Sequence, residues 1–415
     1  MKKANMRTKK NKKTLVLSVL SFFIVLAMCT SVAAVSDYYS NKSVGLKVAA
    51  MPKDTVIDFD IPNKEPEPEI SEKAYTLLNN MTVEEKVYQM FMITPEQLLS
   101  TSSTVTSSGS SAKTAIETYP VGGVIYFGAN IKNPTQCTDM ISNLQSYSKT
   151  PLFIAVDEEG GSVARIGNNE NMGTTQFPNM GNIENADEAY NVGYTIGTEI
   201  KQFGFNLDFA PVADVDSNPN NTVIGNRAFS SDPNTAAEYV AAAVKGFNDA
   251  GMLCSLKHFP GHGDTDTDTH YGYAEVTKTL DELKECELLP FQSGVKAGAD
   301  FVMLGHLAAP KITGNTIPAS LSKPLIDLLR NEVGFNGIVI TDAMRMDAIV
   351  DDYYSDEAAI LAVQAGVDII LLPNNFKKAS TGVINAVNDG TISEERINQS
   401  VLKILQKKID SGIIK

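Results

Sequence analysis

The chain has 415 residues, 43% of them hydrophobic, which supplies enough apolar material for one large α/β domain or two smaller ones. Its 35 basic and 49 acidic residues give a formal net charge of −14, so the surface repels polyphosphates and we expect no nucleic-acid partner. The composition does not determine the oligomeric state, for which we favour a monomer.

Residues 1–36 predict a targeting segment. A basic stretch, 1–13, precedes an uncharged apolar run from Thr14 to Ser36, which fits a signal peptide cleaved after Ala34. The run is also long enough to span a bilayer, so an uncleaved N-terminal membrane anchor stays open as the alternative. In both cases the basic flank stays inside, and we expect the rest of the chain to be secreted or held at the cell surface.

The next segment, 37–71, predicts a flexible linker, because "IPNKEPEPEIS" is rich in proline and charge. Periodic structure begins at "EKAYTLL", and we assign 72–415 to a single folded domain. A polar tract at 100–113 is expected to be a loop tip, with a short amphipathic helix as the alternative. The three cysteines after the leader form no CxxC pair, which argues against a disulfide framework and a thiolate zinc site.

Eight short apolar runs predict parallel strands that are covered on both faces, because the runs are continuous rather than alternating. They lie at 88–93, 122–127, 152–157, 207–215, 254–259, 301–306, 337–343 and 368–373. Helix-like segments that close with a glycine separate most of them. This order favours an α/β fold of the (β/α)8 TIM-barrel type over an open doubly wound sheet. Neither GxGxxG after the first strand nor a P-loop motif occurs, and we expect no cofactor.

In such a barrel the active site lies at the C-terminal ends of the strands. The polar residues that end the apolar runs are therefore candidates by position: Asp157, Asp214, Lys257, His258, His306 and Asp342. All four histidines fall on this predicted rim, three of them within "KHFPGHGDTDTDTH" at 257–270. A helix cap or a satisfied hydrogen bond at the rim stays open as the structural alternative, above all for His306 and His262.

Metal binding is a weaker interpretation of the same loop. Asp264, Asp266, Asp268 and Glu275 have the spacing of calcium ligands, but Thr269 occupies the position where a calcium loop needs glycine. Zinc binding by the histidines of this loop is disfavoured, since "HFPGH" does not place two imidazoles on one helical face. We therefore expect no metal.

Acid–base chemistry fits the loop better. In an extended backbone residues i and i+2 project to the same side, so the Asp268 carboxylate can bind one ring nitrogen of His270. The other nitrogen can then donate or accept a proton near neutral pH. Asp342, at the tip of the seventh predicted strand, could serve as a carboxylate nucleophile.

Six motifs, which occur in a fixed order, resemble those of glycoside hydrolase family 3. They are "MTVEEKVYQMF", "VGGVIYF", "VDEEGGSVARI", "VIGNRAF", "KHFPGHGDTDTDTHYG" and "ITDAM". The resemblance covers about residues 73–411, and it is strongest to the branch of single-domain β-N-acetylglucosaminidases, which carries an Asp-x-His dyad on this loop. It implies a (β/α)8 barrel that acts on a carbohydrate substrate by a retaining, two-step hydrolysis.

The resemblance also implies the role of each residue. Asp342 would attack the anomeric carbon, while His270, oriented by Asp268, would protonate the leaving oxygen and then activate water. The residues that would grip sugar hydroxyls and the N-acetyl group are Asp157, Arg165, Arg227, Lys257 and His258. From the residues alone, a structural ion pair within the barrel stays open for Arg165 and Arg227.

The expected function is removal of terminal N-acetylglucosamine from cell-wall fragments or other short glycans. The chain contains no tryptophan and only 7% aromatic residues, which suits a pocket for one terminal sugar better than a cleft for a polymer. Another exo-β-glycosidase of the family and an N-acetylglucosaminide phosphorylase are close alternatives. A non-catalytic sugar- or metal-binding surface protein is the alternative of a different class.

Overall fold

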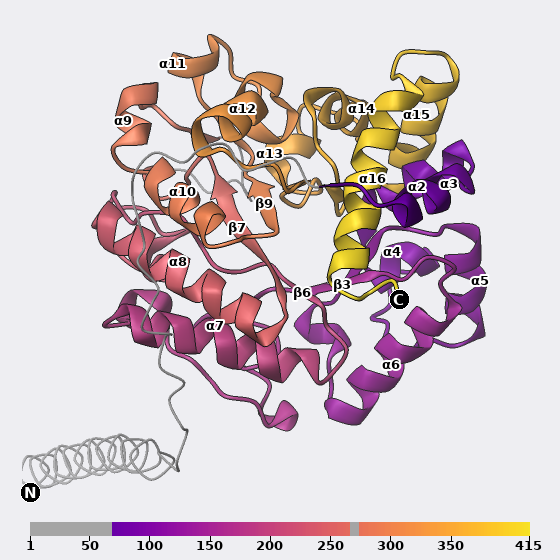
Figure 1. Cartoon of the computed structure of the whole chain (residues 1–415), viewed down its shortest axis with the longest axis horizontal. Coiled ribbons are helices and arrows are strands. Elements are labelled where there is room, and N and C mark those ends of the chain that lie inside the picture. Colours follow the sequence, from indigo (N-terminus) through magenta and orange to yellow (C-terminus); the bar gives the residue numbers. More distant parts are fainter. Residues whose placement is uncertain (1–68, 266–273) are drawn as a thin grey trace, which may run out of the picture. The chain divides into compact units, whose positions relative to one another are not determined.

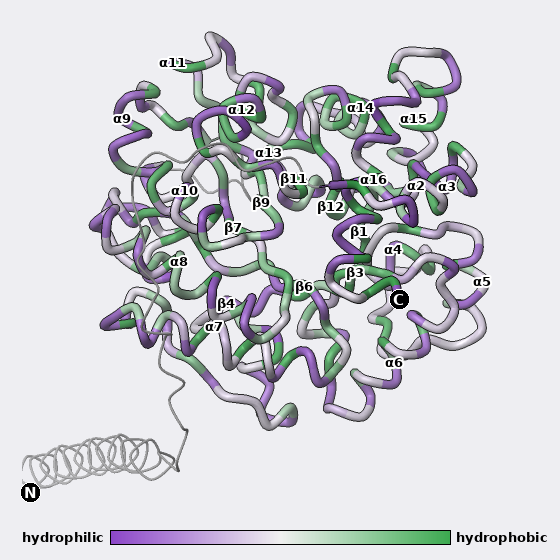
Figure 2. The backbone as a smooth tube through the Cα atoms, viewed as in Figure 1, coloured by the Kyte–Doolittle hydropathy of each residue, from purple (hydrophilic) through white to green (hydrophobic). Residues whose placement is uncertain are grey.

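The computed structural model describes residues 69–265 and 274–415, and Figure 1 shows their helices and strands. Each of the eight predicted apolar runs contains a strand of one sheet. The strands are β1 Phe91–Ile93, β2 Gly123–Ile125, β3 Phe153–Val156, β6 Leu207–Asp208, β7 Leu253–Phe259, β9 Phe301–Leu304, β11 Ile338–Thr341 and β12 Ile370–Leu371. All of their residues are buried, and β3, β11 and β12 carry the hydrophobic end of the colour scale in Figure 2.

The sheet closes on itself. Its order is β11-β9-β7-β6-β3-β2-β1-β12 with every neighbouring pair parallel. The two ends of this order meet where Ile340 forms a parallel bridge with Ile369 and the Thr341 N–H donates to the Ile369 carbonyl at 3.1 Å. The predicted (β/α)8 barrel is therefore confirmed.

The helices form a layer around the barrel in Figure 1. Those before and between the first strands are α2 Glu72–Asn79, α3 Val83–Gln89, α4 Pro95–Leu99, α5 Ser110–Thr118, α6 Pro134–Tyr147, α7 Ala186–Lys201 and α8 Pro233–Ala250. Those that follow are α9 Leu280–Lys284, α10 Leu288–Lys296, α11 Pro310–Thr313, α12 Lys323–Leu328, α13 Asp347–Val350, α14 Ser355–Ala365, α15 Phe376–Asn388 and α16 Glu394–Asp410. Helices α7 and α8 pack very closely, because a Cβ on Gly193 would lie 2.2 Å from the Ala243 carbonyl oxygen.

The predicted helix ends are mostly correct. Gly251 and Gly366 cap α8 and α14 in the left-handed conformation, with φ of 66° and 119°. Helix α7 instead ends at Lys201 with Gln202 as its C-cap, two residues before Gly204, the glycine expected to cap it. The polar tract at 100–113 combines both alternatives, since its first part has no helix and α5 begins at Ser110.

Two short strand pairs were not predicted. The antiparallel hairpin β4 Glu158–Gly160 and β5 Val163–Ala164 follows β3, and β8 Ala274–Glu275 pairs with β10 Leu307–Ala308. They escape prediction because each strand is only two or three residues long, too short to leave a pattern in the sequence. No helix of the described residues is both long and apolar enough to cross a membrane. The predicted leader at 1–36 lies outside those residues, as does the predicted linker apart from 69–71.

Helix α16 packs across the N-terminal ends of the strands. Asp300, which precedes β9, accepts a hydrogen bond from Lys407 Nζ at 2.8 Å and another from a backbone N–H of the neighbouring strand. Asp368, which precedes β12, likewise accepts from the Ser400 hydroxyl at 2.5 Å and from a backbone N–H of β11. This end of the barrel is therefore held by buried carboxylates that bind the last helix, as expected of the face that serves stability.

Lys408, which follows Lys407 in α16, is fully buried, and it has no acidic partner among the described residues. Its Nζ donates to Gln89 Oε1 at 2.9 Å and lies 5.0 Å from the centre of the Phe153 ring. Burial lowers the pKa of Lys408 to about 7. In the unfolded chain a lysine keeps its ordinary pKa of about 10.4, so this side chain opposes folding at every pH below about 10, and it does so most strongly below pH 7.

We expect Lys408→Met to raise the free energy of unfolding at pH 6, and we expect this gain to shrink as the pH rises toward 10. Below pH 7 both states bind the proton, and the wild type bears the full cost of a buried charge. Between the two pKa values only the unfolded state binds it, so wild-type stability rises with pH. Urea denaturation at several pH values measures the difference.

The neighbouring lysine provides the control. Lys407→Met leaves Asp300 buried without its cation and should lower stability instead. A gain from Lys408→Met that stayed constant between pH 6 and 10 would contradict the titration of Lys408 as its source.

Candidate active site

A cavity of about 350 Å³ lies at the C-terminal ends of the strands, and we call it the central cavity. The predicted site residues that line it are Asp157, Arg165, Arg227, Lys257, His258 and Asp342. Apolar strand residues such as Ile125, Met303 and Leu371 complete its wall. The other two predicted site residues, Asp268 and His270, lie outside the described residues.

Two cations of the central cavity share one buried carboxylate, that of Glu159. Lys257 Nζ lies 2.6 Å from Glu159 Oε1 and 3.0 Å from Asp157 Oδ1. Arg227 binds Glu159 in a bidentate manner, with Nη2–Oε1 and Nε–Oε2 distances of 2.8 and 2.9 Å. The structural ion pair left open for Arg227 is therefore present, and the same arginine also lines the cavity.

This network keeps Glu159 and Lys257 charged. Burial opposes the charge of Glu159, but Lys257 and Arg227 outweigh it and hold the pKa of Glu159 well below its usual range. Burial likewise opposes the charge of Lys257, yet Glu159 and Asp157 raise the pKa of Lys257 above its usual value. Charged groups fixed in this way can make strong hydrogen bonds to hydroxyl groups.

Arg165 is held less tightly than Arg227. Its Nη2 lies 3.7 Å from Asp157 Oδ2, and its guanidinium carbon lies 5.8 Å from the centre of the Phe127 ring. Asp157 thus stands between Lys257 and Arg165. Its carboxylate is partly exposed and can accept hydrogen bonds from a bound molecule.

Asp214, which is buried, orients His258 and the loop that follows it. The carboxylate accepts from His258 Nδ1 at 2.8 Å and from the His262 backbone N–H at 2.7 Å. Since a carboxylate only accepts, the Nδ1 of His258 carries a proton. His262 also lines the cavity, and its Nδ1 bonds Thr265 Oγ1 at 2.7 Å.

Asp342 follows β11 directly, and its environment favours the carboxylate form. Its Oδ1 accepts from the Ala343 N–H at 2.7 Å. Burial by itself would raise the pKa of Asp342, but the positive fields of His258 and His306 and the Ala343 N–H together hold it below its usual value. At neutral pH this group is therefore an anion at the rim of the cavity.

His306 contacts the backbone of Ala343, the residue that follows Asp342. Its Nε2 lies 3.0 Å from the Ala343 carbonyl oxygen and its Nδ1 lies 2.8 Å from Ser320 Oγ. Because a carbonyl oxygen only accepts, Nε2 carries a proton. His306 is fully buried, so the satisfied rim hydrogen bond that the sequence left open describes it.

The β4–β5 hairpin carries Glu159 and Arg165 to the cavity, and it is anchored by Glu158. The Glu158 carboxylate accepts from the backbone N–H groups of Ile166 and Gly167 at 2.7 and 2.8 Å. The Glu158 N–H donates to Asp208 Oδ1 at 2.9 Å. Burial raises the pKa of Glu158 to about 7 and that of Asp208 well above its usual value.

Sequence reasoning missed three residues of this site. Glu159 stands in the quoted motif "VDEEGGSVARI", but nothing in the motif separates it from Glu158. Phe127 ends the second predicted strand and Arg345 follows "ITDAM", so their places after strands were the available signal. Within the described residues no group of three or more His, Cys, Asp or Glu side chains could hold a metal ion. The calcium and zinc alternatives depend partly on residues 266–273, which the structure does not describe.

The family model and the individual relatives found by comparison with known proteins agree with one another. The model of the glycosyl hydrolase family 3 N-terminal domain matches residues 82–407. Beta-hexosaminidase A of Pseudoalteromonas piscicida is 36% identical over 71% of this chain and 54% of its own length. Beta-hexosaminidase LpqI of Mycobacterium tuberculosis is 34% identical over 72% of this chain and 78% of its own.

A solved structure, that of a glycoside hydrolase family 3 beta-N-acetylglucosaminidase from Paenibacillus sp. str. FPU-7, superposes with a TM-score of 0.75 at 36% identity. It covers 81% of this chain and 64% of that one. The chain thus spans about half to two thirds of the length of these longer relatives.

Proposed function

The chain belongs to glycosyl hydrolase family 3, and on that premise we propose that it is a retaining exo-β-N-acetylglucosaminidase. The observation that carries the proposal is the Asp342 carboxylate, which is kept ionised at the rim of a cavity lined by fixed charged groups. The volume of 350 Å³ lies near the lower end of ligand pockets and suits one terminal sugar.

In the proposed mechanism Asp342 attacks the anomeric carbon as the glycosidic oxygen leaves. His270, oriented by Asp268, donates a proton to that oxygen, so that a glycosyl-enzyme ester and a free alcohol result. The same histidine then takes a proton from water, whose oxygen attacks the anomeric carbon and releases Asp342. The Asp342 environment supports the first role, while the dyad is proposed from the sequence.

The proposed sugar contacts rest on the charges around the cavity. Asp157, Lys257 and Arg165 present two cations and an acceptor close together, a pattern suited to the vicinal hydroxyls of a pyranose. We propose that Arg227 and His258 complete this grip, since both line the cavity and both are held in place by buried carboxylates.

The natural source of the sugar is proposed from the sequence together with the names of the relatives. We propose terminal N-acetylglucosamine of cell-wall fragments or short glycans, acted on by a protein secreted or anchored at the cell surface. The basic stretch at 1–13 and the apolar run from Thr14 to Ser36 support this location.

Release of p-nitrophenol from the β-N-acetylglucosaminide and from the β-glucoside tests the proposal. We expect selective cleavage of the N-acetyl substrate, unchanged by a chelator. Proton NMR of the first product formed should show the β-anomer of N-acetylglucosamine, because two inversions retain the configuration. Preference for the β-glucoside would assign the chain to another exo-glycosidase activity.

Two further outcomes separate the remaining alternatives. Release of a sugar 1-phosphate in phosphate buffer would show that the reaction is phosphorolysis rather than hydrolysis. Binding of N-acetylglucosamine without cleavage of either substrate would support the non-catalytic surface protein, and loss of activity with chelator would support a metal hydrolase.

A further inference from the structure

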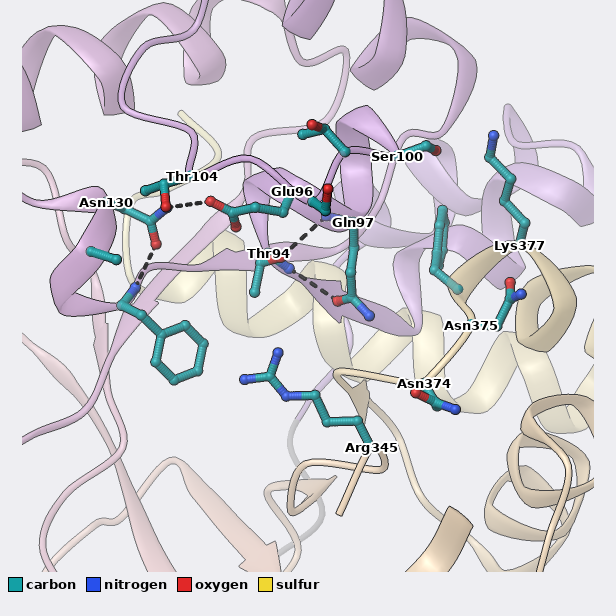
Figure 3. A pocket seen from close by; sticks show the side chains of 15 residues that line it. Thr94, Glu96, Gln97, Ser100, Thr104, Asn130, Arg345, Asn374, Asn375 and Lys377 are labelled. Carbon is teal, nitrogen blue, oxygen red and sulfur yellow. Dashed lines mark hydrogen bonds between the residues drawn. The ribbon is translucent and has the colours of Figure 1, made fainter. Parts of the chain in front are cut away.

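A second cavity of about 590 Å³, which we call the side cavity, adjoins the central one. It is lined by residues from 94–104, 127–130 and 374–377 and by Arg345 (Figure 3). These segments follow β1, β2, β12 and β11, so the side cavity lies at the same end of the barrel as Asp342. The two cavities share Phe127 and Arg345 as lining residues, which makes the side cavity a continuation of the candidate active site.

The polar wall of the side cavity is fixed by its own hydrogen bonds. Glu96 Oε1 accepts from Asn130 Nδ2 at 2.7 Å and from a backbone N–H at 2.8 Å. Gln97 exchanges hydrogen bonds with Thr94 and donates to the Pro373 carbonyl at 2.6 Å. Hydroxyl and amide groups held in this way are suited to a ligand rich in hydroxyls, such as a second sugar unit.

Arg345 stands at the junction of the cavities. In Figure 3 its side chain extends into the side cavity toward Thr94 and Gln97. Its guanidinium carbon lies 5.2 Å from the centre of the Phe127 ring, and among the residues at 69–265 and 274–415 it forms no ion pair or hydrogen bond. By contrast, Arg165 and Arg227 both pair with carboxylates.

The charge balance of the side cavity is positive. Arg345 and Lys377 are its basic lining residues and Glu96 is its acidic one, although the chain as a whole carries −14. Glu96 already accepts two hydrogen bonds through one oxygen. Glu96 attracts Arg345 electrostatically but forms no ion pair with it among the described residues. The guanidinium can therefore still bind a carboxylate through two parallel N–H donors.

We propose that the side cavity binds the leaving group of the glycosidase reaction and that Arg345 selects leaving groups that carry a carboxylate. This inference rests on the proposed function. The two proposals are distinct. The proposed function concerns the terminal sugar and the bond that is cleaved, whereas this inference concerns the group on the other side of that bond.

A matched pair of substrates tests it. N,N′-diacetylchitobionic acid and N,N′-diacetylchitobiitol share the terminal sugar and the β-1,4 bond, and they differ only in a carboxylate or a CH2OH group at the far end. With the full chain we expect kcat/KM to be at least about tenfold higher for the acid. Arg345→Gln should bring the ratio close to one, and Arg345→Lys should restore part of it.

Lys377→Gln removes one positive charge elsewhere on the cavity wall, and it should leave most of the preference for the acid. Equal kcat/KM values for the two substrates in the wild type, or an unchanged ratio in Arg345→Gln, would overturn the proposal while leaving the glycosidase intact.

A binding measurement keeps the two proposals separate. Calorimetric titration of the Asp342→Ala variant with the same pair should show tighter binding of the acid, which Arg345→Gln should remove in the double variant. If the wild type cleaves neither compound nor the p-nitrophenyl glycoside, the proposed function fails, and this titration still decides for or against a carboxylate site at Arg345.

Discussion

Asp342→Ala should lower kcat for p-nitrophenyl β-N-acetylglucosaminide by about 10⁴-fold or more, because it removes the atom that forms the covalent intermediate. The fold should persist, since the side chain lies at the cavity rim and, among the described residues, its carboxylate accepts a hydrogen bond only from the Ala343 N–H. Steady-state kinetics together with circular dichroism of the variant measures both expectations.

Added azide makes this test specific for a nucleophile. With Asp342→Gly, azide can attack the anomeric carbon from the face that the carboxylate occupied and should yield an α-glycosyl azide. Asp351→Ala changes an exposed aspartate nearby on the chain and should keep wild-type activity. Activity of Asp342→Ala within tenfold of the wild type would show that another group attacks the sugar.

Glu159→Gln should destabilise the protein by about 3–5 kcal/mol, because it leaves the buried Lys257 and the partly buried Arg227 without their shared anion. The amide has the same shape, so the loss comes from charge rather than from a cavity. Chemical denaturation at pH 7 measures the free energy of unfolding, and the affinity for N-acetylglucosamine should fall as Lys257 and Arg227 lose their fixed positions.

Glu170→Gln provides the matched control, since Glu170 is exposed and follows the same hairpin along the chain. Its unfolding free energy should stay within about 0.5 kcal/mol of the wild type. If Glu159→Gln also leaves the free energy of unfolding unchanged, the charge network around Lys257 does not stabilise this side of the cavity.

The barrel could be predicted because its strands leave a simple trace in the sequence. A strand covered by helices outside and by packed side chains inside is apolar on both faces, so β3 and β11 read as unbroken hydrophobic runs. Once the runs were placed, the rule that active sites lie at strand C-termini selected Asp157, Lys257 and Asp342 without knowledge of any contact. All three line the central cavity.

The pairing of charges could not be predicted in the same way. Glu159 and Arg227 are 68 residues apart, and their contact depends on a short hairpin and a loop that carry no periodic pattern. Glu158 and Glu159 look alike in sequence, yet successive residues of β4 project to opposite sides, so one anchors the hairpin and the other faces Lys257. The sequence also could not show that Arg345 has no ion pair or hydrogen bond among the described residues, because such an arrangement leaves no motif.

The position of α16 has a consequence for truncation of the chain. Every residue that lines the central cavity precedes Glu394, where this helix begins. Yet the buried carboxylates Asp300 and Asp368 accept hydrogen bonds from Lys407 and Ser400 of this helix. A chain that stops before Glu394 would therefore carry every described residue of the cavity wall but would lack the Ser400 and Lys407 groups that bind Asp368 and Asp300 at the opposite end of the barrel.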